Sequence, residues 1–247
     1  MAVVQKIRCR VERLVNHGDH VYTVELVPER RVPLFRPGQF LHLALDDYDP
    51  AGFWPESRVF SIANSPNQRE RLTISYSVRG RFTGRMENEL EEGRFVWIKL
   101  PYGEFVVDDS KDAVIFAGGT GITAFTAFIG SLTPNFPRGI YLFYGARCVS
   151  LLIYSGMTDR VAARVPEFHV SYSVEEPFES LSNGEHCSWS GHASTGRLSV
   201  AAAWPLIQSP SQANYYIAGP PLMVESIRRD LRDRQVAPES IRVDAWE

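Results

Sequence analysis

The chain has 247 residues, of which 44% are hydrophobic and 22% charged, and its formal net charge is −3. This composition is typical of a globular protein of one or two domains, and the small negative charge argues against a nucleic-acid partner. The first residues hold no apolar run typical of a signal peptide, and no segment approaches the roughly 20 apolar residues of a membrane helix. We therefore expect a cytoplasmic protein without a membrane span.

Cysteine usage argues against two kinds of site. Cys9, Cys148 and Cys187 are far apart and odd in number. They form neither a disulfide framework nor the close cluster that a plant-type iron–sulfur centre needs. The six histidines are equally scattered, so we expect no metal site.

The first part of the chain alternates apolar and polar residues with a period of two. In "RLTISYSVR" (71–79) every second residue is apolar, and 21–27, 38–45 and 94–100 also have the pattern of strands. Turn residues separate these segments. Short strands joined by turns predict an antiparallel Greek-key β-barrel or sandwich over residues 1–107.

One short helix is expected inside this first domain. In "TGRMENELEEG" (83–93), Met86 and Leu90 have helical spacing and Gly93 ends the pattern. Thr83 is the expected N-cap, because a hydroxyl at that place accepts from the free N–H groups of the first turn.

The second part of the chain, residues 108–247, has a different pattern. A wholly apolar strand is expected at 113–117 and further apolar strands at 140–146, 168–174, 214–220 and 241–246, with helices at 122–132, 150–164 and 221–234. Strand–helix alternation predicts a doubly wound parallel α/β domain. Residues 175–197 are expected to form a long surface loop.

A glycine-rich turn follows the first strand of this domain. "AVIFAGGTGITAF" places Gly119, Thr120 and Gly121 between a strand and a helix. Glycines allow close backbone approach, and a helix N-terminus attracts a pyrophosphate. The spacing differs from G-x-G-x-x-G, so a tight turn and a nucleotide site remain equally open.

Two other stretches also allow two interpretations. "YYIAGPPLMVESI" (215–227) is either a rigid strand-to-helix turn or the second wall of a ligand crevice. In "RVFSIANSP" (58–66), Arg58 is suited to a pyrophosphate, Phe60 to a planar ring and Ser61 to a ring edge. The alternative for the last stretch is an ion-paired arginine beside ordinary core.

Together the three stretches resemble, in the same chain order, the ferredoxin–NADP reductase superfamily. The matching residues read Arg58-Val-Phe-Ser61, Gly118-Gly-Thr-Gly-Ile122 and Ala218-Gly-Pro-Pro-Leu-Met223. Smaller matches, such as "RPGQF", "LPYGEF", "FYGAR" and "VDAWE", extend the resemblance over nearly the whole chain. Two departures are Ala218, where many members have cysteine, and Ala124, where proline is usual.

The resemblance implies that the barrel binds a flavin, FAD in preference to FMN. Arg58 would neutralise its pyrophosphate, Phe60 would pack against its ring system, and Ser61 would reach its N5 side. The implied flavin-binding residues are Arg58, Val59, Phe60, Ser61, Ser77, Val78, Arg79, Phe82 and Thr83.

The resemblance also implies that the α/β domain binds NADH or NADPH. The implied residues are Gly119, Thr120, Gly121, Gly145, Arg147, Glu175, Gly219, Pro220 and Met223. Glu175 and Glu176 would repel a 2′-phosphate and so favour NADH slightly, although Arg147 and Arg197 remain possible phosphate ligands. Trp246 would stack on the flavin and move aside for the nicotinamide; the alternative is a structural tryptophan between domains.

The implied activity is a flavin-dependent NAD(P)H oxidoreductase, with Ser61 and Trp246 as catalytic residues and no acid–base pair. Hydride would pass from NAD(P)H to FAD, and electrons then to a separate ferredoxin, an oxygenase component or free flavin. Two other classes remain: an electron-transfer subunit of a larger complex, and a non-catalytic nucleotide-binding regulator.

Overall fold

The computed structural model describes residues 3–176 and 192–244. The chain divides into two compact units: Met1–Val106 with Thr123–Phe128, and Val107–Ile122 with Ile129–Glu247. Each unit contains one six-stranded sheet. The described residues include no helix long and apolar enough to cross a membrane.

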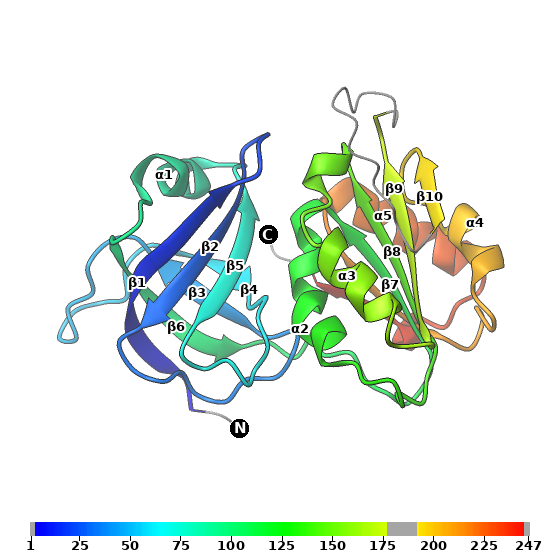
Figure 1. The fold of residues 1–247 in the computed structure, drawn as a ribbon, viewed down its shortest axis with the longest axis horizontal. Coiled ribbons are helices and arrows are strands. Elements are labelled where there is room, and N and C mark those ends of the chain that lie inside the picture. The colour runs from blue at the N-terminus through cyan, green and yellow to red at the C-terminus, as the bar shows by residue number, and fades with distance from the viewer. Residues whose placement is uncertain (1–2, 177–191, 245–247) are drawn as a thin grey trace. The chain divides into compact units, whose positions relative to one another are not determined.

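The first sheet is antiparallel, with strand order β4-β3-β6-β1-β2-β5, and it curls into a nearly closed barrel (Figure 1). Its strands are β1 (Gln5–Asn16), β2 (Val21–Pro28), β3 (Phe40–Ala44), β4 (Ser57–Ser61), β5 (Leu72–Ser77) and β6 (Phe95–Tyr102). The predicted β-barrel is therefore confirmed. Two corrections concern the twelve-residue β1, which was not predicted, and β6, which continues to Tyr102, beyond the strand expected at 94–100.

The two outer strands of this order, β4 and β5, meet at a seam. The N–H of Ala63, just beyond β4, donates to the carbonyl of Thr73 in β5 (2.9 Å). The rings of Phe60 and Tyr76 meet edge to face across the same seam, with centroids 6.1 Å apart. Both contacts share one antiparallel register, in which the two residue numbers add to a constant.

Alternation along the strands fills the barrel. Leu72, Ile74 and Tyr76 of β5 are buried, and so are Ile7 and Cys9 of β1. Every second side chain of a strand points to the same face, so these residues form one continuous apolar core. The helix α1 (Arg81–Glu89) adds two buried side chains, Phe82 and Met86, to this core.

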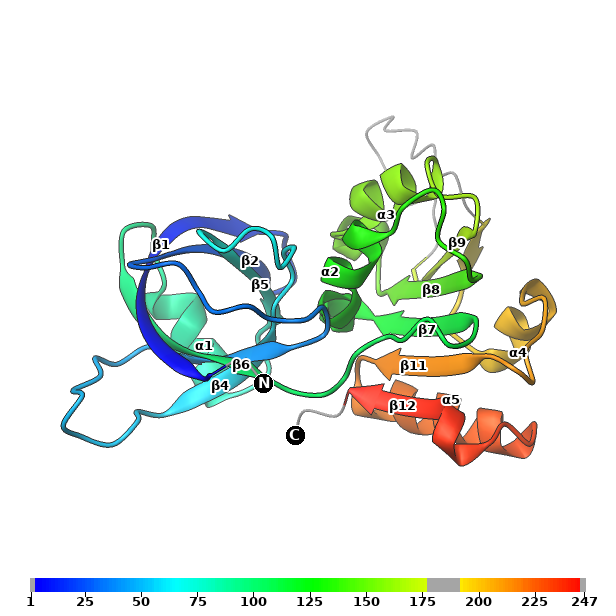
Figure 2. The same cartoon turned by 90° about the horizontal axis from the view of Figure 1, so that it is seen from below.

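The second sheet is wholly parallel, with strand order β10-β9-β8-β7-β11-β12 (Figure 2). Its strands are β7 (Ala113–Gly118), β8 (Ile140–Ala146), β9 (Phe168–Val174), β10 (His192–Thr195), β11 (Asn214–Ala218) and β12 (Ile241–Asp244). The predicted doubly wound domain is confirmed. One correction concerns β10, which lies inside the stretch expected to be loop and pairs with β9.

Helices cover both faces of this sheet. They are α3 (Ser155–Ala162), the short α4 (Val200–Ala203) and α5 (Pro221–Asp233), whereas most of α2 (Thr123–Ser131) belongs to the first unit. Thr158 of α3 shares a 2.6 Å hydrogen bond with the buried Tyr172 of β9. On the opposite face, Ile227 and Leu231 of α5 pack with Tyr215 of β11. The strand ends between these layers therefore meet at common sheet edges.

Candidate functional site

The parallel register brings the predicted nucleotide residues to one edge of the α/β sheet. Gly118 of β7 pairs with Gly145 of β8, which pairs with Ser173 of β9. On the other side of β7, Ala117 pairs with Ala218, the last residue of β11. Four carboxyl strand ends therefore lie in one row, where open α/β sheets bind ligands.

Two loops at this edge pack backbone against backbone. A Cβ atom added to Gly121 would lie 2.5 Å from the carbonyl oxygen of Ala218. A Cβ atom on Gly118 would lie 2.5 Å from the sulfur of Met223 and 2.9 Å from Cδ of Pro220. Glycine is required at both positions for packing. Pro220 and Met223 therefore have a structural role, whatever they contribute to a ligand.

Gly119 is different, because the space in front of it is open. Its φ of +54° lies in the left-handed region, yet an added Cβ atom would have no neighbour within 4 Å among the described residues. Gly119 begins a 3₁₀ turn (Gly119–Ile122) that leads into α2 at Thr123. A glycine with open space at a strand-to-helix turn fits the close approach of a nucleotide phosphate.

Charged residues follow the neighbouring strands at the same edge. Arg147 comes directly after β8, and Glu175 directly after β9. The N–H of Glu175 donates to the carbonyl of Ala146 (3.2 Å), and its carboxylate pairs with Arg197 at 3.0 Å. Both partners of this pair are well exposed, so it is open to exchange for a ligand. Gly145 packs against Leu198, since an added Cβ would lie 2.7 Å from its Cγ.

In the barrel unit, Arg58 has no close carboxylate partner among the residues that the structure describes. Its guanidinium donates to the carbonyl of Ser57 (3.0 Å) and lies over the ring of Phe82, 5.6 Å from the centroid. The carboxylate of Glu56 is 4.0 Å away, at the limit for an ion pair. More than half of the Arg58 side chain is exposed, so it is available to an anion.

The residues after Arg58 present an apolar ring and a hydroxyl. Val59, Phe60 and Ser61 are half-buried at the end of β4. Phe60 packs on the edge of the barrel core. The hydroxyl of Ser61 makes no hydrogen bond to any other residue in the described part of the chain. A partly open ring beside a free hydroxyl suits the predicted flavin, and the residues present therefore fit the group.

The start of α1 differs in detail from the prediction. The N-cap is Gly80, and Thr83 is the third residue of the helix, so the prediction of Thr83 as N-cap is wrong. The Thr83 hydroxyl instead accepts from the N–H groups of Arg79 (2.9 Å) and Gly80 (3.2 Å). This reversed bond stabilises the first turn, as the second half of a capping box does.

Backbone donors remain at this helix start. The N–H of Gly84 donates to the carbonyl of Gly80 (2.8 Å), so the N–H groups of residues 81–83 precede the first intrahelical bond. The Phe82 side chain is buried in the core, so the backbone N–H is the group that this residue could offer to a phosphate. Ser77 ends β5, and the N–H of Val78 donates to the carbonyl of His20 (2.9 Å).

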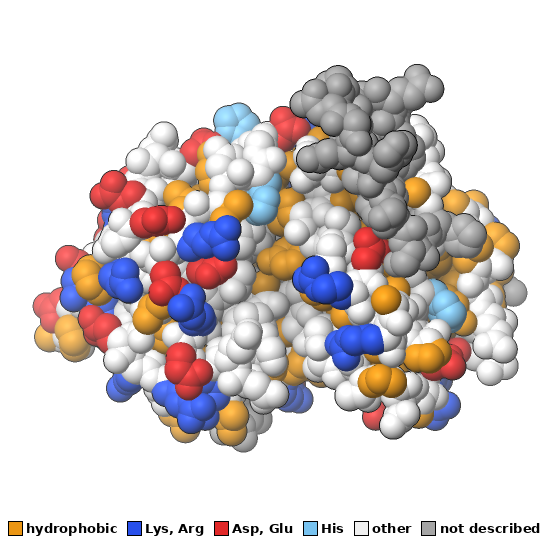
Figure 3. Space-filling view, viewed as in Figure 1, with side chains coloured by type: hydrophobic (Ala, Val, Ile, Leu, Met, Phe, Trp, Pro, Cys, Tyr) orange, Lys and Arg blue, Asp and Glu red, His pale blue; other side chains and the backbone are white. Residues whose placement is uncertain are grey.

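Other arginines near this corner are neutralised. Arg85 donates to Asp46 (2.7 Å) and Glu89 (2.8 Å), and these hydrogen bonds hold the pKa of both carboxyl groups below the ordinary values. Arg81 donates to both oxygens of Glu56 (2.9 Å each). Figure 3 shows basic and acidic side chains interspersed over the barrel surface. Arg58 is therefore better placed than Arg81 or Arg85 to bind an anion.

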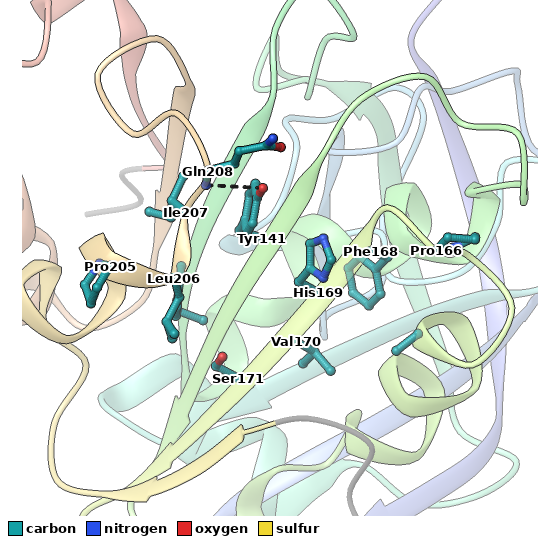
Figure 4. Close-up of a pocket in the computed structure, with 12 residues that line it drawn as sticks. Tyr141, Pro166, Phe168, His169, Val170, Ser171, Pro205, Leu206, Ile207 and Gln208 are labelled. Atoms are coloured by element: carbon teal, nitrogen blue, oxygen red, sulfur yellow. Dashed lines mark hydrogen bonds between the residues drawn. The ribbon is translucent and has the colours of Figure 1, made fainter.

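A cavity of about 580 Å³ lies elsewhere in the α/β unit (Figure 4). Tyr141 and His169, which are stacked 5.0 Å apart in its wall, stand near the amino-terminal ends of β8 and β9. The residues that line it include none of the predicted nucleotide ligands. The cavity is therefore separate from the candidate site at the carboxyl edge.

Two predictions remain untested by the structure. Trp246 lies outside the described residues, so its stacking role stays a prediction. Within the described ranges no group of three or more His, Cys, Asp or Glu side chains is arranged to hold a metal ion. Sequence reasoning also missed a row of polar side chains on the barrel, formed by Ser75, Thr23 and His17.

Comparison with known proteins agrees with this geometry. Residues 115–229 match the family described as oxidoreductase NAD-binding domain. The chain is 29% identical over 228 residues to the reductase component of phenol 2-monooxygenase from Pseudomonas sp. (strain CF600), covering 90% of this chain and 60% of that protein. It is 28% identical over 210 residues to the anthranilate 1,2-dioxygenase electron transfer component of Acinetobacter baylyi, covering 82% of this chain and 55% of that protein. The chain thus spans less than two thirds of the length of these relatives.

A solved structure shows the same fold over the whole chain. The flavohem-like FAD/NAD-binding domain of nitric oxide dioxygenase from Vibrio cholerae superposes with a TM-score of 0.76 at 18% identity, covering 97% of this chain and 98% of that domain. Residues 115–229 therefore match the oxidoreductase NAD-binding domain model, the chain is similar to reductase components of oxygenases, and its two-domain fold is that of the solved FAD/NAD-binding domain.

Proposed function

We propose that this chain is a flavin-dependent NAD(P)H oxidoreductase. It takes hydride from NADH or NADPH onto a bound FAD and passes electrons to a separate acceptor. The observation that carries the proposal is the strand β4, where Arg58, Phe60 and the free hydroxyl of Ser61 stand in sequence at the barrel seam. The match to an oxidoreductase NAD-binding domain supports the nucleotide half.

Bound FAD supplies both hydride and single-electron chemistry, while the chain holds and orients it. Arg58 and the first N–H groups of α1 bind the diphosphate through charge-assisted hydrogen bonds. Phe60 supplies an apolar surface for the ring system, and Ser61 donates a hydrogen bond at the ring edge. The turn at Gly119–Ile122 binds the pyrophosphate of the pyridine nucleotide.

NADH is the favoured coenzyme within this proposal. The carboxylate of Glu175 follows β9, where a 2′-phosphate would approach, and it repels that group while accepting from ribose hydroxyls. Two arginines weaken this repulsion: Arg197 partly neutralises Glu175, and Arg147 follows the end of β8. The preference for NADH over NADPH is therefore expected to be modest. Replacing Glu175 by glutamine is expected to narrow the preference, measured as the ratio of kcat/KM for the two coenzymes.

The acceptor in this proposal is a ferredoxin or an oxygenase component. The relatives support it, since they are named as a reductase component and an electron transfer component of oxygenases. Reduction of free flavin is the alternative, together with a role as a subunit active only within a larger complex. The cytoplasmic location also stays a prediction.

An absorption spectrum followed by anaerobic reduction tests the proposal. The purified protein, loaded with FAD, is expected to be yellow and to bleach when NADH is added, faster than with NADPH. A protein that binds no flavin, or that stays yellow with both coenzymes, would contradict the proposal. Electron transfer to ferricyanide, but not to free flavin, would exclude the free-flavin alternative.

A further inference from the structure

Thr126 of α2 makes a buried hydrogen bond to the barrel. Its hydroxyl donates to the carbonyl of Ala63 at 2.7 Å, and Thr126 is only 3% exposed. Residues Thr123–Phe128 belong to the first unit, so this contact lies inside one compact unit. A ring contact joins the same part of the helix to the barrel, since Phe125 meets Phe105 edge to face with centroids 5.6 Å apart.

The Thr126 hydroxyl does not need this bond to be satisfied. It is also 3.1 Å from the carbonyl of Thr123, three residues earlier in the helix, which is an acceptor that threonines within helices ordinarily use. A hydroxyl has one proton to donate, and the carbonyl of Ala63 is the nearer acceptor. The bond to the barrel is therefore a tertiary contact added to the local helix geometry, and its burial strengthens it.

Ala63 lies two residues beyond Ser61, just after the end of β4. The N–H of Ile62 donates to the carbonyl of Gln39 at 3.0 Å. The N–H of Ala63 donates to the carbonyl of Thr73 at 2.9 Å. Because β4 is an end strand of the sheet order, contacts just beyond its end help to fix where Ser61 lies.

The same helix follows the glycine turn assigned above to the pyridine nucleotide. The 3₁₀ turn Gly119–Ile122 runs directly into α2 at Thr123. Thr126 lies three residues further on, about 4.5 Å along the helix axis. A helix is rigid over so short a length, so a displacement at Thr126 is passed to the residues of the turn.

We propose that Thr126 is a positioning residue for hydride transfer. The inference rests on the proposed function. The bond to Ala63 fixes the start of α2, which follows the nucleotide turn, to the strand end that follows Ser61. Hydride transfer needs the donor and acceptor atoms about 3–3.5 Å apart, and a misplacement of about 1 Å costs up to about 100-fold in rate. Thr126 acts on this geometry through the backbone and touches neither ligand.

Rapid mixing of FAD-loaded protein with NADH under anaerobic conditions separates positioning from binding. Thr126→Val has nearly the same shape but lacks the hydroxyl, whereas Thr126→Ser keeps it. Thr126→Val is expected to lower the limiting rate of flavin reduction by about tenfold or more, with the Kd of NADH unchanged within about twofold. Thr126→Ser is expected to restore about half of the wild-type rate or more. A wild-type limiting rate in Thr126→Val, or an equally slow Thr126→Ser, would overturn the proposal.

Thr158→Val is the matched control. Thr158 of α3 is fully buried, and its hydroxyl also bonds both its own helix, at the carbonyl of Ser155, and a neighbouring strand, at Tyr172. Both valine variants lose a buried hydrogen bond, so both are expected to melt at a lower temperature than the wild type. Only Thr126→Val is expected to be reduced slowly. An equally slow Thr158→Val would show that lost stability, and not position, sets the rate.

A measurement on the flavin-free protein isolates the contact itself. The NMR signal of the Ala63 carbonyl carbon is expected to shift in Thr126→Val, which removes the hydrogen-bond donor, and to stay unchanged in Thr158→Val. An unmoved Ala63 signal in Thr126→Val would remove the contact on which the proposal depends. If NADH reduces none of the proteins, the wild type included, the proposed function falls and the inference with it. If the wild type and Thr126→Val are reduced equally fast, the positioning role falls alone.

Discussion

The two units build their separate candidate binding regions in opposite ways. In the α/β unit the candidate site is built from backbone, since Gly118 and Gly121 are packed against the loop that follows β11. In the barrel the candidate site is built from side chains, namely Arg58, Phe60 and Ser61. We infer that folding and binding are inseparable in the glycine loops, whereas in the barrel each can be changed without the other.

The largest effect is expected from Gly121→Ala. Its new Cβ atom would lie 2.5 Å from the carbonyl oxygen of Ala218, so the two loops must separate. We expect a loss of about 1–3 kcal/mol or more in the free energy of unfolding, together with weaker NADH binding. Urea unfolding and a coenzyme titration measure the two losses.

Gly130→Ala is the control for this prediction. Gly130 lies in α2 and has open space around it, so alanine is expected to stabilise the helix by about 0.5–1 kcal/mol. Equal stability of the two variants would show that the glycine loops are not tightly packed.

The next effect concerns binding without folding. Arg58→Met is expected to weaken FAD binding by about 10–100-fold, because a charge-assisted hydrogen bond contributes about 1.5–3 kcal/mol. The flavin-free protein should keep its melting temperature, since the nearest carboxylate of Glu56 is 4.0 Å from the guanidinium. A fluorescence titration with FAD measures the affinity.

Arg81→Met is the matched control, because Arg81 already has Glu56 as a close partner and is more exposed than Arg58. If both variants lost the same affinity for FAD, the diphosphate would be attracted by the general positive charge of this surface and not by a specific contact with Arg58.

A smaller effect is expected on acid stability. Hydrogen bonds from Arg85 lower the pKa of Asp46 and Glu89 in the folded state. These carboxylates therefore stabilise the barrel above their unfolded pKa values of about 4, and this stabilisation is lost as the pH falls through the folded values. Arg85→Met should flatten the fall in urea midpoint between pH 7 and pH 3. Arg10→Met, an exposed change on β1, should leave the decrease of the urea midpoint with pH as in the wild type. If Arg85→Met also showed the wild-type decrease, Arg85 would not be the group that stabilises these two carboxylates.

The smallest effect is expected from Tyr76→Phe. The Tyr76 hydroxyl is buried and has no hydrogen-bond partner among the residues that the structure describes. Its removal should leave the free energy of unfolding unchanged or raise it by up to about 1 kcal/mol. Tyr22→Phe is the counterpart, since Tyr22 stacks on Tyr76 and donates to Glu87. A thermal melt should show Tyr22→Phe as the less stable variant; the reverse order would disprove the idea that Tyr76 is unsatisfied.

Much of the fold was predictable because the pattern of apolar residues along the sequence reflects which residues are buried. The run at 140–146 is buried along almost its whole length and the run at 168–174 at every second residue, and the structure has strands over those same residues. β1 was missed although Ile7 and Cys9 alternate with polar residues, because the surrounding charges obscured the pattern. The polar strand "HAST" of β10 carries no apolar signal at all.

The candidate site was predictable only in part. The glycine turns are recognisable in the sequence, since glycine is needed wherever backbone approaches backbone. Thr83 was placed wrongly because a hydroxyl that caps from the third helical position has the same local sequence context as an N-cap. The row from Ser75 to His17 depends on which residues face each other across strands, and that register exists only in the folded sheet.

The seam between β4 and β5 has a consequence for the dynamics of the barrel. β4 is joined along its length to β3, and β5 to β2, so each has one fully paired side. At the seam itself, backbone hydrogen bonding is far sparser. Amide protons at the seam should therefore exchange with deuterium sooner than those of β1, which is paired on both sides. The segment that carries Arg58 and Ser61 thus lies where the barrel opens most easily, and a bound ligand there would slow the exchange.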